Sequence, residues 1–84
     1  AGQEAAVRAL AARALADGLT PRELAFRTHQ RFGHALPLAE ALAVLDDEYD
    51  LVEYGGRTPA QIDAAVLAEA RLLQRGRRDP RPAP

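Results

Sequence analysis

Two short stretches of the chain, LTPREL (19–24) and RTPAQI (57–62), carry the same helix-start signal. In each, proline follows threonine, and an acid or amide stands three residues after the threonine: Thr20, Pro21 and Glu23 in the first, Thr58, Pro59 and Gln61 in the second. The two polar side chains of such a pair satisfy backbone N–H groups that a helix start leaves free, and proline's missing N–H has no role at the first helical position. The sequence therefore predicts helices that begin at Pro21 and Pro59.

Apolar residues recur at helical spacing in four segments, and each segment predicts a helix with one buried face. The four stripes are Val7, Leu10, Ala11, Ala14 and Leu15; Leu24, Thr28 and Phe32; Leu38, Leu42, Leu45, Tyr49 and Val52; and Ile62, Ala65, Val66, Ala70 and Leu73. Gly18, Gly33 and the pair Gly55–Gly56 are predicted to end the first three helices, with Gly18 in the left-handed conformation. A break or tightening of the third helix is expected near Asp50. No segment alternates as a strand would. We predict an all-α fold, a small antiparallel bundle of about four helices.

The length of 84 residues indicates one domain, predicted to span residues 1–75. Residues 76–84 combine three prolines with arginines and have no apolar period, so they predict a disordered basic tail. No stretch approaches the roughly 20 apolar residues of a membrane span. The start, AGQEAAVRAL, lacks the apolar run of a signal peptide. We therefore expect a cytoplasmic protein that does not bind membranes.

Several residue types that carry covalent catalysis are missing from the chain. It contains no cysteine, serine or lysine, which excludes thiol and serine nucleophiles, Schiff bases, disulfides and a carrier arm on serine. The threonines Thr20 and Thr58 are already assigned to helix caps. The pair Gly55–Gly56 lacks the lysine and the preceding strand of a phosphate-binding loop. We predict that the protein is not an enzyme and uses no cofactor.

A calcium loop is the metal site that the acidic residues resemble most. Asp46, Glu48 and Asp50 alternate as the first ligands of such a loop do. However, Leu51 stands at the sixth position, where the loop needs glycine, and Arg57 stands at the twelfth, where it needs glutamate. We therefore expect no calcium site.

The two histidines are the remaining candidates for metal ligands. His29 and His34 lie five residues apart, with the predicted helix end at Gly33 between them, and no cysteine completes a zinc set. We predict instead that His29 is a boundary residue bonded to a neighbouring helix. We expect His34 to lie against the carbonyls at the helix C-terminus, where a cation is favoured.

The stretch GLTPRELAFR (18–27) resembles the opening of a helix-turn-helix, which implies DNA binding. Arg22, Arg27 and Arg31 would then contact the DNA backbone. The segment that would enter the groove is acidic, however, and phosphates would repel it. The formal net charge of −1 also gives no general attraction to nucleic acid. A small DNA-binding regulator is therefore the alternative function, and DNA is not the expected partner.

The stretch LDDEYDLVEYGG (45–56) is the predicted binding surface. Five carboxylates and a tyrosine carry the prediction: Asp46, Asp47, Glu48, Asp50, Glu53 and Tyr54. Aromatic residues surrounded by charge are frequent at the energetic centres of interfaces. Tyr54 is the expected anchor, because Tyr49 falls on the apolar stripe. We predict that this surface binds a protein partner of basic character, or a second copy of the chain. The competing interpretation is a solvated helix end that keeps an alanine-rich protein soluble.

The stretch DLVEYGGRTPAQI (50–62) resembles the short tyrosine-bearing third helix and the start of the fourth helix of colicin-type immunity proteins. Only one tyrosine falls where that family carries two. The resemblance implies a small acidic inhibitor of a basic nuclease, and we assign the chain to no family on a likeness of about a dozen residues. An accessory subunit of a larger enzyme is a further alternative to these binding functions.

Overall fold

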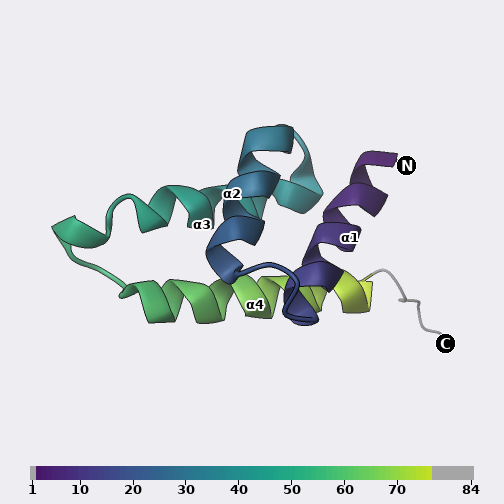
Figure 1. Cartoon of the computed structure of the whole chain (residues 1–84). Coiled ribbons are helices and arrows are strands. Elements are labelled where there is room, and N and C mark those ends of the chain that lie inside the picture. The colour runs from purple at the N-terminus through teal and green to yellow at the C-terminus, as the bar shows by residue number, and fades with distance from the viewer. Residues whose placement is uncertain (1, 77–84) are drawn as a thin grey trace, which may run out of the picture.

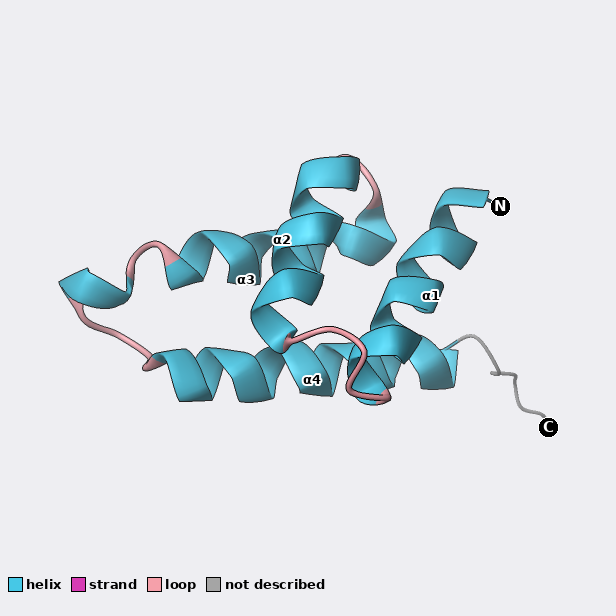
Figure 2. Cartoon of the chain, viewed as in Figure 1, coloured by secondary structure: helices cyan, strands magenta, loops and turns pink. Residues whose placement is uncertain are grey.

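The structure is a computed structural model that describes residues 2–76. Its elements are α1 (Gly2–Leu15), α2 (Pro21–Phe32), the 3-10 helix η1 (Pro37–Ala39), α3 (Glu40–Tyr49), the 3-10 helix η2 (Val52–Tyr54) and α4 (Pro59–Gly76). No strand occurs in this part of the chain, and the predicted all-α fold with four helices is confirmed (Figure 2). The predicted tail began at residue 76; α4 includes Gly76, and residues 77–84 lie outside the described residues.

Helix α2 runs in the opposite direction to α1, and α4 runs in the opposite direction to α3 (Figure 1), while the closest packing is between α2 and α3 and between α1 and α4. The long helix α4 runs along one side of the molecule, and α3 lies beside it in the opposite direction. Helices α1 and α2 cross α4 steeply, and α1 is bonded to its C-terminal part: Arg8 Nε donates to the Leu73 carbonyl at 3.4 Å, and Gln74 Nε2 donates to the Arg8 carbonyl at 2.9 Å. The connection between α3 and α4 therefore forms one end of the molecule, away from α1 (Figure 1).

Both predicted helix starts are confirmed in atomic detail. The hydroxyl of Thr20 accepts from the Glu23 backbone N–H at 3.0 Å, and the Glu23 carboxylate accepts from the Thr20 N–H at 3.0 Å. Thr58 and Gln61 make the same reciprocal pair, at 3.1 and 2.8 Å. The backbone N–H of Thr20 lowers the pKa of the Glu23 carboxyl, because it stabilises the ionised form.

The end of α1 differs from its prediction. Asp17, with φ of 66°, adopts the left-handed conformation that was predicted for Gly18. The Gly18 N–H donates to the Arg13 carbonyl at 2.7 Å, and the Asp17 N–H donates to the Ala14 carbonyl at 3.1 Å, which is a Schellman motif. A Cβ at position 18 would lie 3.1 Å from the Arg13 oxygen, so a larger residue there would require a shift of a few tenths of an ångström.

The core is built from the predicted apolar stripes of all four helices. The largest fully buried side chains are Leu24, Leu42, Ile62, Val7, Val66 and Thr28. Leu19 also joins this cluster from the loop before α2. No helix among residues 2–76 combines the length and the apolar character needed to cross a bilayer.

Candidate functional site

The acidic stretch does not form one continuous helix. The α-helix α3 ends at Tyr49, a turn follows at Asp50 and Leu51, and the backbone tightens into η2. Gly55 and Gly56 then reverse the chain with φ of 102° and 91°, values that glycine adopts without strain. The six predicted site residues therefore belong to two structural units, three in α3 and three in the turn and η2.

The first unit is turned toward neighbouring side chains of the protein. The carboxylate of Asp46 lies 2.9 Å from His29 Nδ1, and a carboxylate oxygen of Asp47 lies 3.7 Å from the same nitrogen. The Asp46 side chain is only 15% exposed. We call Asp46, Asp47 and Glu48 the paired acids, because each lies close to a basic or imidazole group of the same molecule.

Glu48 makes the strongest of these pairs, with Arg57 from the loop before α4. Arg57 Nε and Nη2 donate to the two carboxylate oxygens at 2.7 and 2.6 Å, a bidentate arrangement. These bonds lower the pKa of the Glu48 carboxyl and raise the pKa of the Arg57 guanidinium. The pair joins the last turn of α3 to the start of α4 and leaves little of the Glu48 charge for a partner.

Tyr49 divides the two units. It is 6% exposed, which confirms its predicted place in the core, and its hydroxyl donates to Asp63 of α4 at 2.5 Å. Arg22 of α2 lies over the ring, 4.7 Å from its centroid. Burial, followed by the hydrogen bond to Asp63, raises the pKa of the Tyr49 phenol well above its usual value. The residue thus fastens the end of α3 to both α2 and α4.

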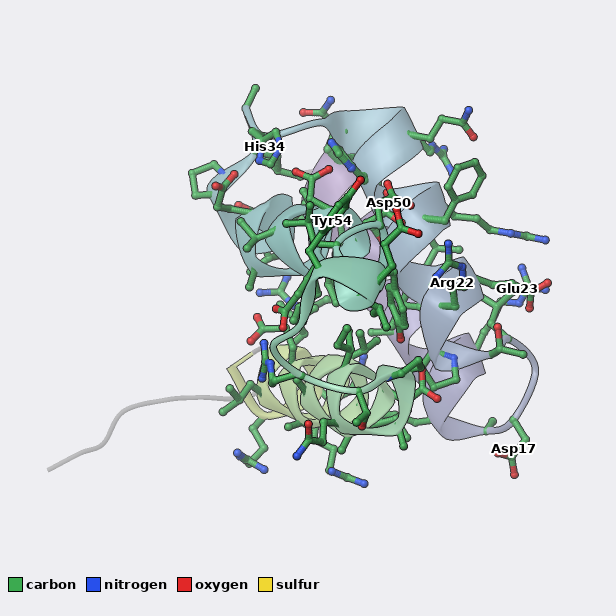
Figure 3. The ribbon with its side chains drawn as sticks, turned by 90° about the vertical axis from the view of Figure 1, so that its left-hand side faces the viewer. Asp17, Arg22, Glu23, His34, Asp50 and Tyr54 are labelled. Atoms are coloured by element: carbon green, nitrogen blue, oxygen red, sulfur yellow. The ribbon has the colours of Figure 1, made fainter. Side chains whose placement is uncertain are left out.

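The second unit projects into solvent at the end of the molecule, and we call Asp50, Leu51, Glu53 and Tyr54 the tip. Tyr54 is 77% exposed and Leu51 is 54% exposed, although both are large apolar residues. Glu53 is also exposed, and the Asp50 side chain is 73% exposed. Figure 3 looks onto this end, where Tyr54 and Asp50 lie on the near side. The tip therefore combines apolar area with two solvent-facing carboxylates.

The two histidines come together, in contrast to the expectation that the helix end separates them. Gly33 does end α2, as predicted, with φ of 60°, and the reversal that follows brings His34 back against His29. Their ring centroids are 4.7 Å apart, in an edge-on arrangement. His29 is bonded to the neighbouring helix α3, as predicted. His34 contacts Glu40 at 2.9 Å, and its predicted place beside the helix C-terminal carbonyls is therefore wrong.

A different charge pattern marks the groove between α1 and α2. Arg13, Arg27 and Arg31 line this open hollow together with Leu10 and Gln30. Arg27 and Arg31 were named as DNA-backbone contacts, and Arg13 joins them from the other helix. Arg22 lies elsewhere, beside Tyr49 and 3.7 Å from Asp50.

Two contributors to these surfaces were missed in the sequence. Leu51 lies between the predicted site residues. It does not belong to the apolar stripe of the third segment, and this could have indicated that its side chain is exposed. Glu40 stands six residues after His34, a spacing that carries no signal because η1 intervenes. No protein-family model matches the chain, and neither a curated protein nor a solved structure matches it.

Proposed function

We propose that the protein acts by binding a basic segment of another protein through the tip, and that it is not an enzyme. The observation that carries the proposal is the exposure of Tyr54 and Leu51 beside the carboxylates of Asp50 and Glu53. Large apolar side chains gain free energy when a partner covers them, and tyrosine is among the residues most enriched at the centres of interfaces.

The tip is held in shape before any partner arrives. The Tyr54 N–H donates to the Leu51 carbonyl at 3.0 Å, and the Gly55 N–H donates to the Val52 carbonyl at 3.1 Å. Val52 is half-buried and packs against the core from the same turn. A preformed loop loses less conformational entropy on binding than a flexible one, so it favours affinity.

The charges of the tip select the chemistry of the partner. Asp50 and Glu53 are exposed, and Arg22 contacts Asp50 only at 3.7 Å between two exposed side chains. Exposed pairs of this kind contribute little, so the Asp50 carboxylate stays available. Arginine or lysine side chains of a partner would complement these two acids, with Tyr54 and Leu51 packed between them.

The experiment begins with a pull-down from the native cell with the wild-type chain and two variants, and two further variants are used once the partner is purified. Tyr54→Ala should lose the partner, and Leu72→Ala, which truncates a residue of α4 with 50% exposure, is the matched control. With the recovered partner purified, Tyr54→Ala should weaken binding by roughly 30-fold or more, the effect of a truncated interface centre. Asp50→Asn should slow association and make it less sensitive to salt, with Asp17→Asn as the control.

Equal retention of the partner by Tyr54→Ala and Leu72→Ala would contradict the proposal. If the partner proves to be a second copy of the chain, the sedimentation profile will shift to a dimer that Tyr54→Ala dissociates. If the partner is an enzyme whose stability depends on the chain, the function is that of an accessory subunit.

DNA binding remains the second candidate, and one observation favours it. Arg13, Arg27 and Arg31 converge on the groove between α1 and α2, on elements that do not carry the paired acids. A mobility-shift titration with a mixed-sequence duplex at low salt tests this directly. Binding that Arg27→Gln and Arg31→Gln abolish, while Tyr54→Ala does not change it, would replace the first proposal.

A further inference from the structure

The histidine pair and the nearest paired acid form a compact set of metal-ligating side chains. One ligand atom each from His29, His34 and Asp47 lies within 4.8 Å of the other two. The residues come from the last turn of α2, from the loop after it and from α3, so the set exists only in the folded chain.

Two of the distances within the set are close to those that one small ion requires. His29 Nδ1 lies 3.7 Å from one oxygen of Asp47, and His34 Nε2 lies 3.5 Å from the other. In a tetrahedral zinc site, bonds of about 2.0–2.2 Å hold neighbouring ligand atoms roughly 3.3–3.6 Å apart. The Asp47 carboxylate thus lies between the two ring nitrogens at nearly the spacing that a shared ion requires.

A second observation, independent of this spacing, concerns the other nitrogen of His34. Its Nδ1 lies 2.9 Å from a carboxylate oxygen of Glu40. A histidine that binds a metal usually donates its remaining ring N–H to a carboxylate or carbonyl, which fixes the ring and directs the free lone pair at the ion. Glu40 holds His34 in this way, with Nε2 facing Asp47.

Asp46 lies next to this set and could contribute a fourth ligand. Its carboxylate now lies 2.9 Å from His29 Nδ1, and the side chain is mostly buried. When His29 Nδ1 binds an ion, the neutral ring carries its proton on Nε2 and the contact with Asp46 is exchanged for the metal bond. The Asp46 carboxylate would then turn from His29 toward the ion to serve as an oxygen ligand.

We propose that His29, His34 and Asp47, with Asp46 as the fourth ligand and Glu40 as the positioning residue, bind a zinc ion. Two imidazoles and two carboxylates form a mixed nitrogen and oxygen set, which suits zinc and not the all-oxygen preference of calcium or magnesium. The ion would link the end of α2 to α3 and stabilise the fold by binding only the folded state. The site does not depend on the tip or on its partner.

Titration calorimetry of the untagged chain with zinc sulfate tests the proposal. The wild type should bind one zinc ion per chain, Co²⁺ should give the visible absorption of a tetrahedral site, and millimolar Mg²⁺ or Ca²⁺ should not displace zinc. His34→Ala should abolish the cobalt spectrum; that side chain is 47% exposed, and circular dichroism checks that the variant keeps its helices. Glu40→Gln, which keeps both histidines, should weaken zinc binding by about 10–100-fold.

Asp17→Asn is the matched control, since Asp17 is an exposed acid on the opposite side of the view from His34 (Figure 3). Its zinc affinity should equal that of the wild type. Absence of stoichiometric zinc binding by the wild type overturns the proposal. So does unchanged binding in His34→Ala, or displacement of zinc by magnesium.

Discussion

Asp46 and Asp50 stand four residues apart in one acidic run, yet their side chains have opposite environments. Asp46 is mostly buried against His29 of α2, whereas Asp50 lies in solvent at the end of α3. The same contrast extends along the run: Glu48 is held by two bonds from Arg57, and Glu53 is exposed on η2. A run of like charges is therefore not one surface, because each carboxylate takes the environment of the side of the helix on which it lies.

Tyr49 lies between the paired acids and the tip and separates their two environments. Its ring is buried under Arg22 and its hydroxyl is bonded to Asp63, so the last turn of α3 is fixed against two other helices. The chain on one side of this residue belongs to the packed domain, and the chain on the other side projects from it.

Removal of the Tyr49 side chain should have the largest effect. Tyr49→Ala leaves a cavity and the Asp63 carboxylate without its donor, and such truncations of buried aromatics lower the free energy of unfolding by about 3–5 kcal/mol. Urea denaturation followed by circular dichroism measures the loss. The control is Tyr54→Ala, which should stay within about 0.5 kcal/mol of the wild type because the residue is exposed. If both variants lost the same free energy of unfolding, Tyr49 would contribute no more to the stability of the fold than the exposed Tyr54.

Tyr49→Phe isolates the hydrogen bond to Asp63 and should lower stability by about 1–2 kcal/mol at neutral pH. It also changes the pH dependence. The pKa of Tyr49 is raised in the folded state, so the phenol stays protonated there while the unfolded chain ionises near pH 10. Wild-type stability should therefore fall as the pH rises above about 10, since ionisation favours the unfolded state.

The Tyr49→Phe variant should lack this loss of stability at high pH, and Tyr54→Phe should keep it. The midpoints of urea denaturation of the wild type and of both variants are compared at pH 8 and above pH 10. Parallel loss of stability in wild type and Tyr49→Phe would show that the phenol of Tyr49 is not held protonated.

The matched pair Asp46→Ala and Asp50→Ala tests the two halves of the run directly. Asp46→Ala removes the bond to His29 and should lower stability by about 1 kcal/mol. Asp50→Ala should leave stability unchanged or raise it slightly, because an acid at a helix C-terminus opposes the helix dipole. Thermal unfolding at pH 7 gives the change in stability for both variants. A larger loss for Asp50→Ala than for Asp46→Ala would mean that the contact between Asp46 and His29 does not stabilise the fold.

Only a small loss of stability is expected from Glu48→Gln, because the pair with Arg57 is partly exposed to solvent, and its diagnostic feature is its pH dependence. The pKa of Glu48 is lowered in the folded state by Arg57. The resulting stability is present above the unfolded pKa, near 4.5, and is lost as the pH falls through the lower folded value. The difference between wild type and Glu48→Gln should thus be present at pH 7 and vanish in acid. A difference in stability that does not change with pH would mean that the Glu48 side chain contributes through packing and not through its charge.

Several local features were predicted from the sequence, but the third helix was predicted to end at Gly55–Gly56, and α3 ends at Tyr49. Both threonine caps, the end of α2 at Gly33 and the four buried stripes depend on residues within a few positions of one another. The end of α1 shows where local prediction reaches its limit. Gly18 was predicted to adopt the left-handed conformation, but Asp17 adopts it instead, and Gly18 lies close to the Arg13 carbonyl, where a Cβ would be 3.1 Å from the oxygen.

The surroundings of the acidic run and of the histidines depend on how the helices pack. The sequence named Asp46, Asp47, Glu48, Asp50, Glu53 and Tyr54 as one set, and the packing of α2 and α4 against α3 divided it into paired acids and tip. The same packing placed His34 beside His29 and between Glu40 and Asp47. Caps and stripes follow from the periodicity of a single helix. The surroundings of a charge follow from which helix lies next to it, and that is set by the burial of apolar faces distant from the charge itself.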